Sequence, residues 1–306
     1  MNKSTLWLGA LLVTACGEPS EQPSDTNRPD LSDLLDAGPV SSPDAGASAD
    51  AGVAPSDAGP SPIDAGGNVE PDAGPPAPVA TEQRYAMKAV SAVQQRNPSP
   101  LGNEEVRVTT TQYVLLESER LEEDFSWTET LCSITTSEAR YRFGIRASTS
   151  YPAAFVDHFP TFERTGTWTE AGEFSAGPMA SVVGAELANP LRDPLPTEPG
   201  AGGEIDSDED GHPGVTVNVG GAVSGSVYVA QRSIISLRGR ERDGGRIEGL
   251  WQSNDEQVVL GASSGILNRQ VERRRDPEDA ASFFIMTPID DAWDCDDITA
   301  RIDELF

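Results

Sequence analysis

The sequence contains few of the residues from which catalytic and metal centres are usually built. Its 306 residues include only two histidines and three cysteines, and no two cysteines form a C-x-x-C pair. A dedicated zinc site is therefore not expected, because such sites draw their ligands from closely spaced cysteine and histidine residues. The glycine-rich loops that bind nucleotide phosphates are also absent, so nothing in the sequence indicates nucleotide binding.

One apparent catalytic motif lacks the histidine that it needs. Residues 261–265 (GASSG) fit the G-x-S-x-G pattern of a nucleophile elbow. That fold places the triad histidine after the serine, whereas His158 and His212 both precede Ser263. We therefore predict a glycine–serine turn here. Carboxylates are abundant enough to supply a glycosidase pair, but the sequence singles out no two of them.

Positive charge is scarce. Lysine and arginine number 22 against 50 aspartate and glutamate residues, which gives a formal net charge of −28. Acidic residues outnumber basic ones both before and after position 84, so the acidity is a property of the whole chain. Such a surface argues against nucleic acid as a partner and against binding to anionic lipid head groups, and it is compatible with cation binding.

The N-terminus has the features of a processing signal. Lys3 precedes a short apolar run, and residues 13–16 (VTAC) place small residues before Cys16. An apolar run this short is too short to span a membrane. The segment resembles the signal of bacterial lipoproteins, and the resemblance implies lipidation of Cys16 after removal of the signal. Gly17 follows instead of the aspartate associated with inner-membrane retention, which favours the outer membrane, at its periplasmic face or at the cell surface. An ordinary secretory signal is the alternative.

Residues 17–83 are expected to be a disordered linker. The tripeptide Asp-Ala-Gly recurs among prolines and serines, and the segment has no aromatic residue. So little apolar surface cannot offset the entropy cost of ordering the chain. The segment resembles the Asp-Ala-Gly-rich linkers of some bacterial outer-membrane lipoproteins. The predicted organisation is a signal at 1–16, a linker at 17–83 and a single folded domain at 84–306.

Two cysteines remain besides the lipidation site, namely Cys132 and Cys295. An exported protein with one remaining pair allows a single intramolecular connectivity, so we predict a disulfide between them. Two separate buried thiols are the alternative. A cross-link that closes so long a loop stabilises by on the order of 5 kcal/mol in the chain-entropy model.

The domain reads as mainly β. Period-two alternation and β-branched residues predict strands at 106–115, 125–131, 141–146, 174–187, 215–219, 223–238, 247–252, 257–261 and 282–287. Turns are predicted at 242–246 and 253–255, and a helix at 295–306. The tryptophans spread along these strands are expected in the core. The expected fold is an antiparallel meander that closes into a barrel or half-barrel, by analogy with lipocalins and lipoprotein carriers, and a β-sandwich is the alternative.

One acidic stretch has the spacing of a cation site. Asp206, Asp208 and Asp210 occupy alternate positions, and Gly211 follows them. Hard oxygen ligands at alternate positions of a tight loop can converge on one ion. The stretch resembles the D-x-D-x-D-G loops of EF-hand-like and thrombospondin-repeat-like proteins. The resemblance implies a Ca²⁺ site in which His212 would offer only its backbone carbonyl.

This loop departs from the EF-hand pattern in two respects. Its twelfth position is Val217 instead of a bidentate glutamate, and a strand instead of a helix is expected to follow it. A full site would need another carboxylate, such as Glu204 or Glu209, and a solvated acidic turn is the alternative. Five further aspartates between 290 and 297 could form a second cation site, but we expect them to cap the C-terminal helix.

These features favour a lipid-anchored cell-envelope protein with a non-catalytic binding or structural role, stabilised by Ca²⁺. Two alternatives stay open. One is a carboxylate-based hydrolase of envelope or extracellular polymers. The other is a lipocalin-like carrier of a small apolar ligand, which requires an open apolar cavity. The sequence identifies no protein or small-ligand partner beyond the membrane that holds the anchor.

Overall fold

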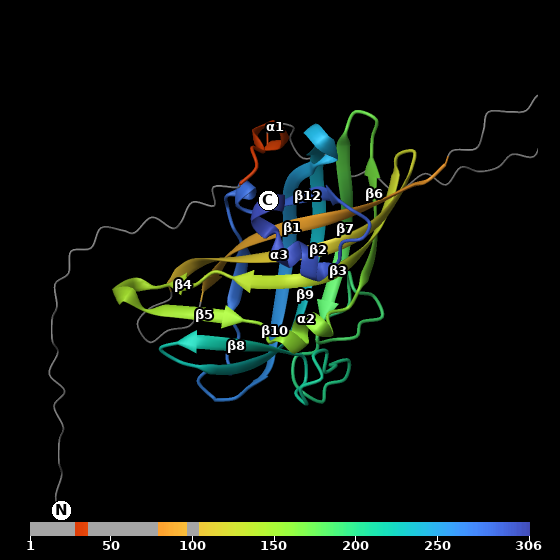
Figure 1. The fold of residues 1–306 in the computed structure, drawn as a ribbon. Helices are drawn as coiled ribbons and strands as arrows, with labels where there is room; N and C mark the ends of the chain where they lie inside the picture. The colour runs from red at the N-terminus through yellow and green to blue at the C-terminus, as the bar shows by residue number, and fades with distance from the viewer. Residues whose placement is uncertain (1–27, 36–78, 97–103) are drawn as a thin grey trace, which may run out of the picture.

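The computed structural model describes residues 28–35, 79–96 and 104–306. The predicted signal at 1–16, with Cys16, and most of the predicted linker lie outside the described residues. The described part of the chain is mainly antiparallel β, as the sequence predicted (Figure 1). None of its helices is both long enough and apolar enough to cross a membrane.

Eight strands pair edge to edge and close into a ring. In ring order they are β1 (Thr81–Arg96), β2 (Glu105–Leu121), β3 (Asp124–Thr136), β6 (Phe162–Trp168), β7 (Glu173–Val183), β9 (Gly225–Glu241), β10 (Ile247–Ala262) and β12 (Phe283–Ile289). Each strand pairs antiparallel with the next ring strand along the chain, and β12 pairs back onto β1. The predicted antiparallel meander is therefore confirmed, in a closed and barrel-like form.

The remaining strands extend this sheet at one end. β8 (Val215–Gly221) pairs with β9, β5 (Arg146–Ser150) with β8, β4 (Ala139–Arg140) with β5, and β11 (Glu272–Arg275) with β1. The helical segments are α1 (Ser32–Leu35), η1 (Arg142–Gly144), α2 (Ala153–Asp157), η2 (Asp243–Gly245), η3 (Asp279–Ala281), α3 (Cys295–Ala300) and α4 (Ile302–Leu305). In Figure 1 the strands β4, β5 and β8 lie together at the lower end of the molecule.

Aromatic side chains fill the upper part of the ring, where β3 and β7 begin. Phe125, Trp127 and Phe174 are at most 3% exposed, and the ring centroids of Phe125 and Phe174 lie 5.7 Å apart. Fully burying each such side chain stabilises the fold by about 1.5–3 kcal/mol. The expectation that tryptophans lie in the core is confirmed for Trp127, Trp168 and Trp251, whereas Trp293 is half-buried outside the ring.

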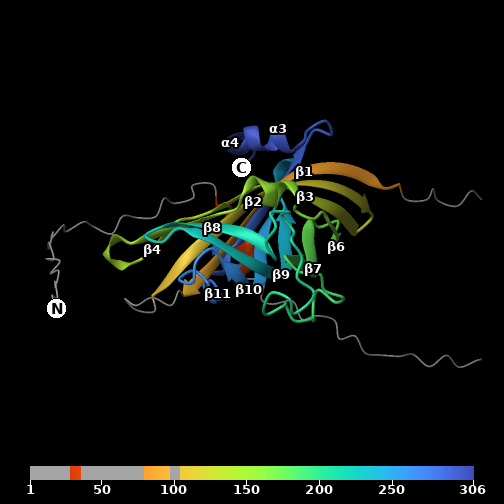
Figure 2. The ribbon, with the colours of Figure 1, turned by 90° about the horizontal axis from the view of Figure 1, so that it is seen from below.

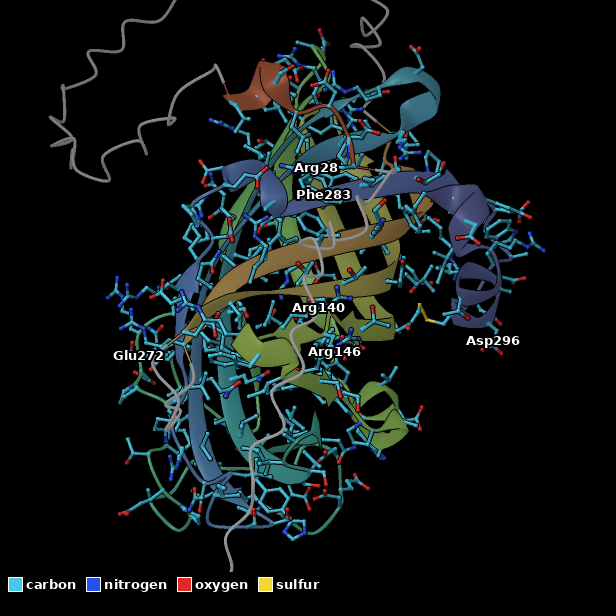
Figure 3. The ribbon with its side chains drawn as sticks, turned by 90° about the vertical axis from the view of Figure 1, so that its left-hand side faces the viewer. Arg28, Arg140, Arg146, Glu272, Phe283 and Asp296 are labelled. Carbon is cyan, nitrogen blue, oxygen red and sulfur yellow. A yellow bond between two sulfur atoms is a disulfide. The ribbon has the colours of Figure 1, made fainter. Side chains whose placement is uncertain are left out.

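A second apolar layer covers the outside of β1 and β12. Met87 of β1 faces the ring interior, whereas Ala86 and Val90 pack outward against Phe283 and Ile285 of β12. The helices α3 and α4 close this outer layer. Cys132 of β3 and Cys295 of α3 form the predicted disulfide, with an S–S distance of 1.99 Å and a sequence separation of 163 (Figure 3). The cross-link fastens the C-terminal helices to the ring.

A short segment of the predicted linker belongs to the folded part. Leu31 and Leu34 are at most 5% exposed and pack into the outer apolar layer. Asp33 accepts a hydrogen bond of 3.0 Å from Arg242. Residues 28–35 therefore contact the domain, and the first strand begins at Thr81, three residues before the predicted boundary.

Two local predictions are wrong. Residues 141–145 of the strand predicted at 141–146 do not form a strand, because Phe143 takes a left-handed conformation (φ 61°) within η1 and the chain turns before β5 begins at Arg146. Residues 253–255 do not form a turn. They continue β10 and pair with β9, so that 247–262 is one strand.

Candidate functional site

The loop Asp206–Gly214 is the last part of the connection between β7 and β8. Ser207 N donates to Gly214 O at 3.0 Å, and Gly214 N donates to Ile205 O at 2.8 Å, so the loop closes on itself. Gly214 has a φ of 93°, and a Cβ atom there would lie 2.5 Å from Val229 O. The glycine therefore allows the loop to pack directly against the backbone of β9.

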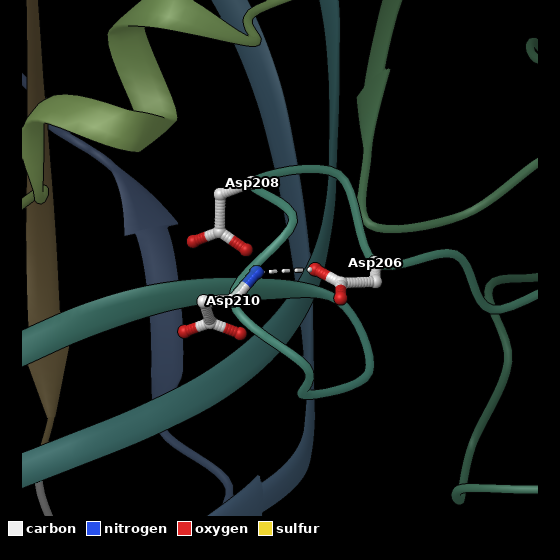
Figure 4. Close-up of side chains that lie close together, drawn as sticks. All are labelled: Asp206, Asp208 and Asp210. Atoms are coloured by element: carbon white, nitrogen blue, oxygen red, sulfur yellow. Dashed lines mark hydrogen bonds between the residues drawn. The ribbon is translucent and has the colours of Figure 1, made fainter.

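The three predicted aspartates converge within this loop (Figure 4). One carboxylate oxygen each from Asp206, Asp208 and Asp210 lies within 4.8 Å of the other two. Two ligands on opposite sides of a Ca²⁺ ion are about 5 Å apart, because Ca–O distances are 2.3–2.6 Å. The acidic triad therefore has the spacing to hold one metal ion.

Hydrogen bonds from the loop backbone fix two of the three carboxylates. Asp206 accepts from Asp210 N at 3.1 Å and from Gly211 N at 2.8 Å. Asp210 accepts from His212 N at 2.9 Å and from the Thr216 hydroxyl. These bonds hold the carboxylates in place although their negative charges repel one another.

Asp208 is the buried member of the triad. The residue is only 2% exposed, and its Oδ2 accepts a hydrogen bond from Thr216 N at 2.8 Å. Its Oδ1 is buried and has no hydrogen-bond partner. Burial, reinforced by the charges of Asp210 and Asp206, raises the pKa of the Asp208 carboxyl above its ordinary value. A buried anionic oxygen without a partner is costly, and a bound cation would remove that cost.

The other residues considered as ligands lie outside the triad. The His212 ring stacks on Tyr228, with centroids 4.0 Å apart, and no observation tests the predicted role of its backbone carbonyl. Glu204 accepts from Gly200 N and Gly202 N, at 2.6 and 2.9 Å. Glu209 lies 3.6 Å from His158. Among the described residues, the site thus consists of three carboxylates, and water or backbone oxygens would complete the six to eight ligands of Ca²⁺.

The aspartates near the C-terminus cap a helix, as predicted. Asp294 accepts from Asp296 N and Asp297 N, and Asp297 accepts in return from Asp294 N. This is a reciprocal capping box. The segment 261–265 is likewise a turn, in which Ser263 Oγ accepts from Ser226 N at 2.9 Å. Both segments have structural roles.

A second candidate site was missed by the sequence reasoning. A cavity of about 640 Å³ opens at the lower end of the ring, and its lining includes residues of β2, β5, β8, β9, β10 and β11. Val108, Val217, Val229 and Val259 line it. Because these residues lie far apart in the chain, no local pattern marks them as one surface.

Comparison of the chain with protein-family models, with curated protein sequences and with solved structures found no significant match.

Proposed function

We propose that this protein is a lipid-anchored cell-envelope protein whose β domain has a non-catalytic binding or structural role. Cys16 would carry the anchor at the outer membrane, and the loop Asp206–Gly214 would bind Ca²⁺. The signal-like N-terminus and the Asp-Ala-Gly-rich segment support the address. The acidic triad supports the cation.

The buried Asp208 oxygen is the observation that carries the cation site. An exposed acidic turn would be satisfied by water, whereas Asp208 Oδ1 is shielded from solvent and unpartnered beside two further carboxylates. Carboxylates are ligands for both Ca²⁺ and Mg²⁺, but Mg²⁺ sheds its water reluctantly and demands octahedral geometry. A loop with three fixed carboxylates and several open positions therefore suits Ca²⁺ better.

The proposed role of the ion is to clamp the entrance of β8. Thr216, the second residue of β8, donates its amide to Asp208 and its hydroxyl to Asp210. A cation on the triad would fix both acceptors and, through them, the start of the strand. With three protein carboxylates the expected Kd is about 10⁻⁴–10⁻³ M, the range of extracellular Ca²⁺ modules.

A thermal melt tests the cation site. The sample is residues 16–306 with Cys16→Ser, the polypeptide that remains once the predicted signal is cleaved before position 16. A ligand that binds only the folded state raises the Tm by mass action, by about 2.7 kcal/mol of stability at 100 times its Kd. Millimolar Ca²⁺ is expected to raise the Tm of this protein and to leave the Tm of Asp208→Asn unchanged. Asp291→Asn, which removes an exposed carboxylate elsewhere, is the control and keeps the response. No shift in the parent protein would contradict the site.

The anchor is tested in cells with the full chain. The parent protein is expected to incorporate labelled palmitate and to fractionate with the outer membrane. Cys16→Ser is expected to remain unlabelled and to leave the membrane fraction. Labelling that persists in Cys16→Ser would refute lipidation at this position.

A further inference from the structure

The two ends of the ring are packed differently. Phe125 and Phe174 fill the upper part, whereas Val217, Val229 and Val259 face inward at the lower end, which is turned toward the viewer in Figure 2. Because valine is much smaller than phenylalanine, the same ring that is filled at one end leaves a cavity of about 640 Å³ at the other. Small-molecule sites occupy about 300–1,000 Å³, so the cavity has the size of a ligand site.

The mouth of this cavity carries exposed apolar side chains. Ile266 is 56% exposed and Val223 is 38% exposed, and both line the cavity. Large apolar residues exposed beside an apolar cavity mark a binding surface. A ligand that fills the cavity and reaches its mouth would cover them.

Two arginines give the cavity positive charge. Arg269 and Arg273 both line it, and within the described part of the chain neither guanidinium has a carboxylate partner. Arg273 Nε is buried and has no hydrogen-bond partner. Arg273 also lines a smaller cavity of about 130 Å³ inside the ring, so this residue borders both cavities.

The next two arginines of β11 each have a carboxylate partner. Arg274 lies 3.7 Å from Glu105, and Arg275 lies 2.8 Å from Asp279. In a chain with a net charge of −28, carboxylates are available almost everywhere. An unpaired guanidinium beside an apolar wall therefore indicates that its partner is an anionic group of a ligand, because arginine forms strong bidentate bonds with carboxylates.

We infer that this cavity binds a single-chain amphiphile with an anionic head group, of which a free fatty acid is the simplest. The inference rests on the proposed binding role and names its ligand class, but it does not depend on the cation site. The alkyl chain lies among the valines and reaches Ile266 at the mouth. The carboxylate lies at Arg273, where it supplies the partner that the buried Nε lacks.

A displacement assay tests this assignment. Residues 16–306 with Cys16→Ser are mixed with a dansyl-labelled fatty acid without detergent, and unlabelled palmitate competes for the site. Palmitate is expected to displace the probe, and each CH₂ removed from the competitor weakens binding roughly fourfold. Hexadecanol, which has the same chain and a neutral head, is expected to compete at least tenfold less well. The phospholipid phosphatidylglycerol, the other source of an anionic head and alkyl chains, is expected not to displace the probe.

Variants separate the head-group contact from general damage. Arg273→Gln is expected to weaken palmitate binding at least tenfold, whereas Arg275→Gln, on the same strand but outside the cavity, leaves it unchanged. Val219→Trp, which fills the cavity from β8, is expected to abolish binding while the Tm stays near that of the parent. Asp208→Asn is expected to bind palmitate normally, so a failed cation site and a failed ligand site give different results. Equal binding of palmitate and hexadecanol, displacement by phosphatidylglycerol alone, or no binding by a folded parent protein would each overturn the inference.

Discussion

Arg107 of β2 donates two hydrogen bonds of 2.7 Å to the carboxylate of Asp276, which lies 169 residues later in the chain. Asp276 is only 2% exposed, and Gln94 of β1 donates a third bond to the same carboxylate at 2.6 Å. Burial is the largest single influence and would raise the pKa of Asp276, but the hydrogen bonds from Arg107, the Glu278 amide and Gln94, with the charge of Arg107, together hold the pKa below the ordinary value. This carboxylate ties the segment after β11 to the ring.

We expect Asp276→Asn to lower the free energy of unfolding by about 2 kcal/mol at neutral pH, because it removes charge-assisted bonds to a buried group. The pKa of Asp276 is lower in the folded state, so its contribution is present above the unfolded pKa of about 3.9 and is lost as the pH falls through the folded pKa. The difference between parent and variant, measured by urea denaturation, should therefore shrink in acid. Asp279→Asn, at an exposed pair with Arg275, should change stability by less than about 0.5 kcal/mol.

Asp208 is expected to respond in the opposite direction. Its pKa is raised in the folded state, so the ion-free protein gains stability as the pH falls from above the folded pKa toward the unfolded value. In a chelator at neutral pH, Asp208→Asn should be more stable than the parent by about 1 kcal/mol, because a neutral amide replaces the unpartnered oxygen. Urea denaturation with chelator and with Ca²⁺ should thus reverse the order of the two proteins. A variant that is less stable than the parent in chelator would contradict the cost assigned to the buried oxygen.

The strands could be predicted where their signal is local. Alternation in residues 125–131 identifies β3 and places Trp127 in the core, as found. The turn predicted at 253–255 is wrong because Ser253 and Asp255 are turn-forming residues held in mid-strand by pairing with Ile235 and Ser233 of β9. Such pairing depends on a strand some twenty residues away, and no local preference reports it.

The two sites differ in the same way. The acidic triad could be predicted because its three carboxylates lie within five residues, so the spacing of the sequence fixes the geometry of the loop. The valine-lined cavity could not. Its walls come from strands of the ring and from β8 beside it, and its volume depends on which side chains meet after the ring has closed. Leu31 and Leu34 are intermediate, since their three-residue spacing marks an apolar face but not the surface that covers it.

Gly249 of β10 is expected to tolerate no side chain. A Cβ atom there would lie 2.5 Å from the Phe284 ring and 2.3 Å from Arg238 O. Gly249→Ala should therefore lower the free energy of unfolding by about 1–3 kcal/mol, the usual cost of overpacking a core. Gly265→Ala is the matched control, because no other atom lies within 4 Å of the added Cβ. Equal melting temperatures for the two variants would show that β10 can shift away from Phe284.

If Cys16 carries the proposed lipid, the contacts of segment 28–35 with the domain limit the distance between the two. If the whole of 17–83 were free, the linker would give a long reach. Because Arg28 pairs with Glu278 at 2.9 Å and Leu34 is buried, the number of residues between Cys16 and Arg28 sets the greatest possible distance. At about 3.3–3.6 Å per residue, these span at most roughly 40 Å.

Release of segment 28–35 should lengthen the connection between Cys16 and the domain without unfolding the domain. Leu31→Asp with Leu34→Asp places two charges in the outer apolar layer, and such unpaired charges are excluded from apolar surroundings. In the parent protein the amides of Leu34 and Leu35, which donate to Leu31 O at 3.0 and 3.2 Å, should exchange slowly with deuterium. In the double variant they should exchange rapidly, while the amides of β12 stay protected. Leu35→Asp, at a position that is 45% exposed, is the control and should leave the exchange slow. Rapid exchange at Leu34 in the parent would contradict the docking of segment 28–35 on the domain.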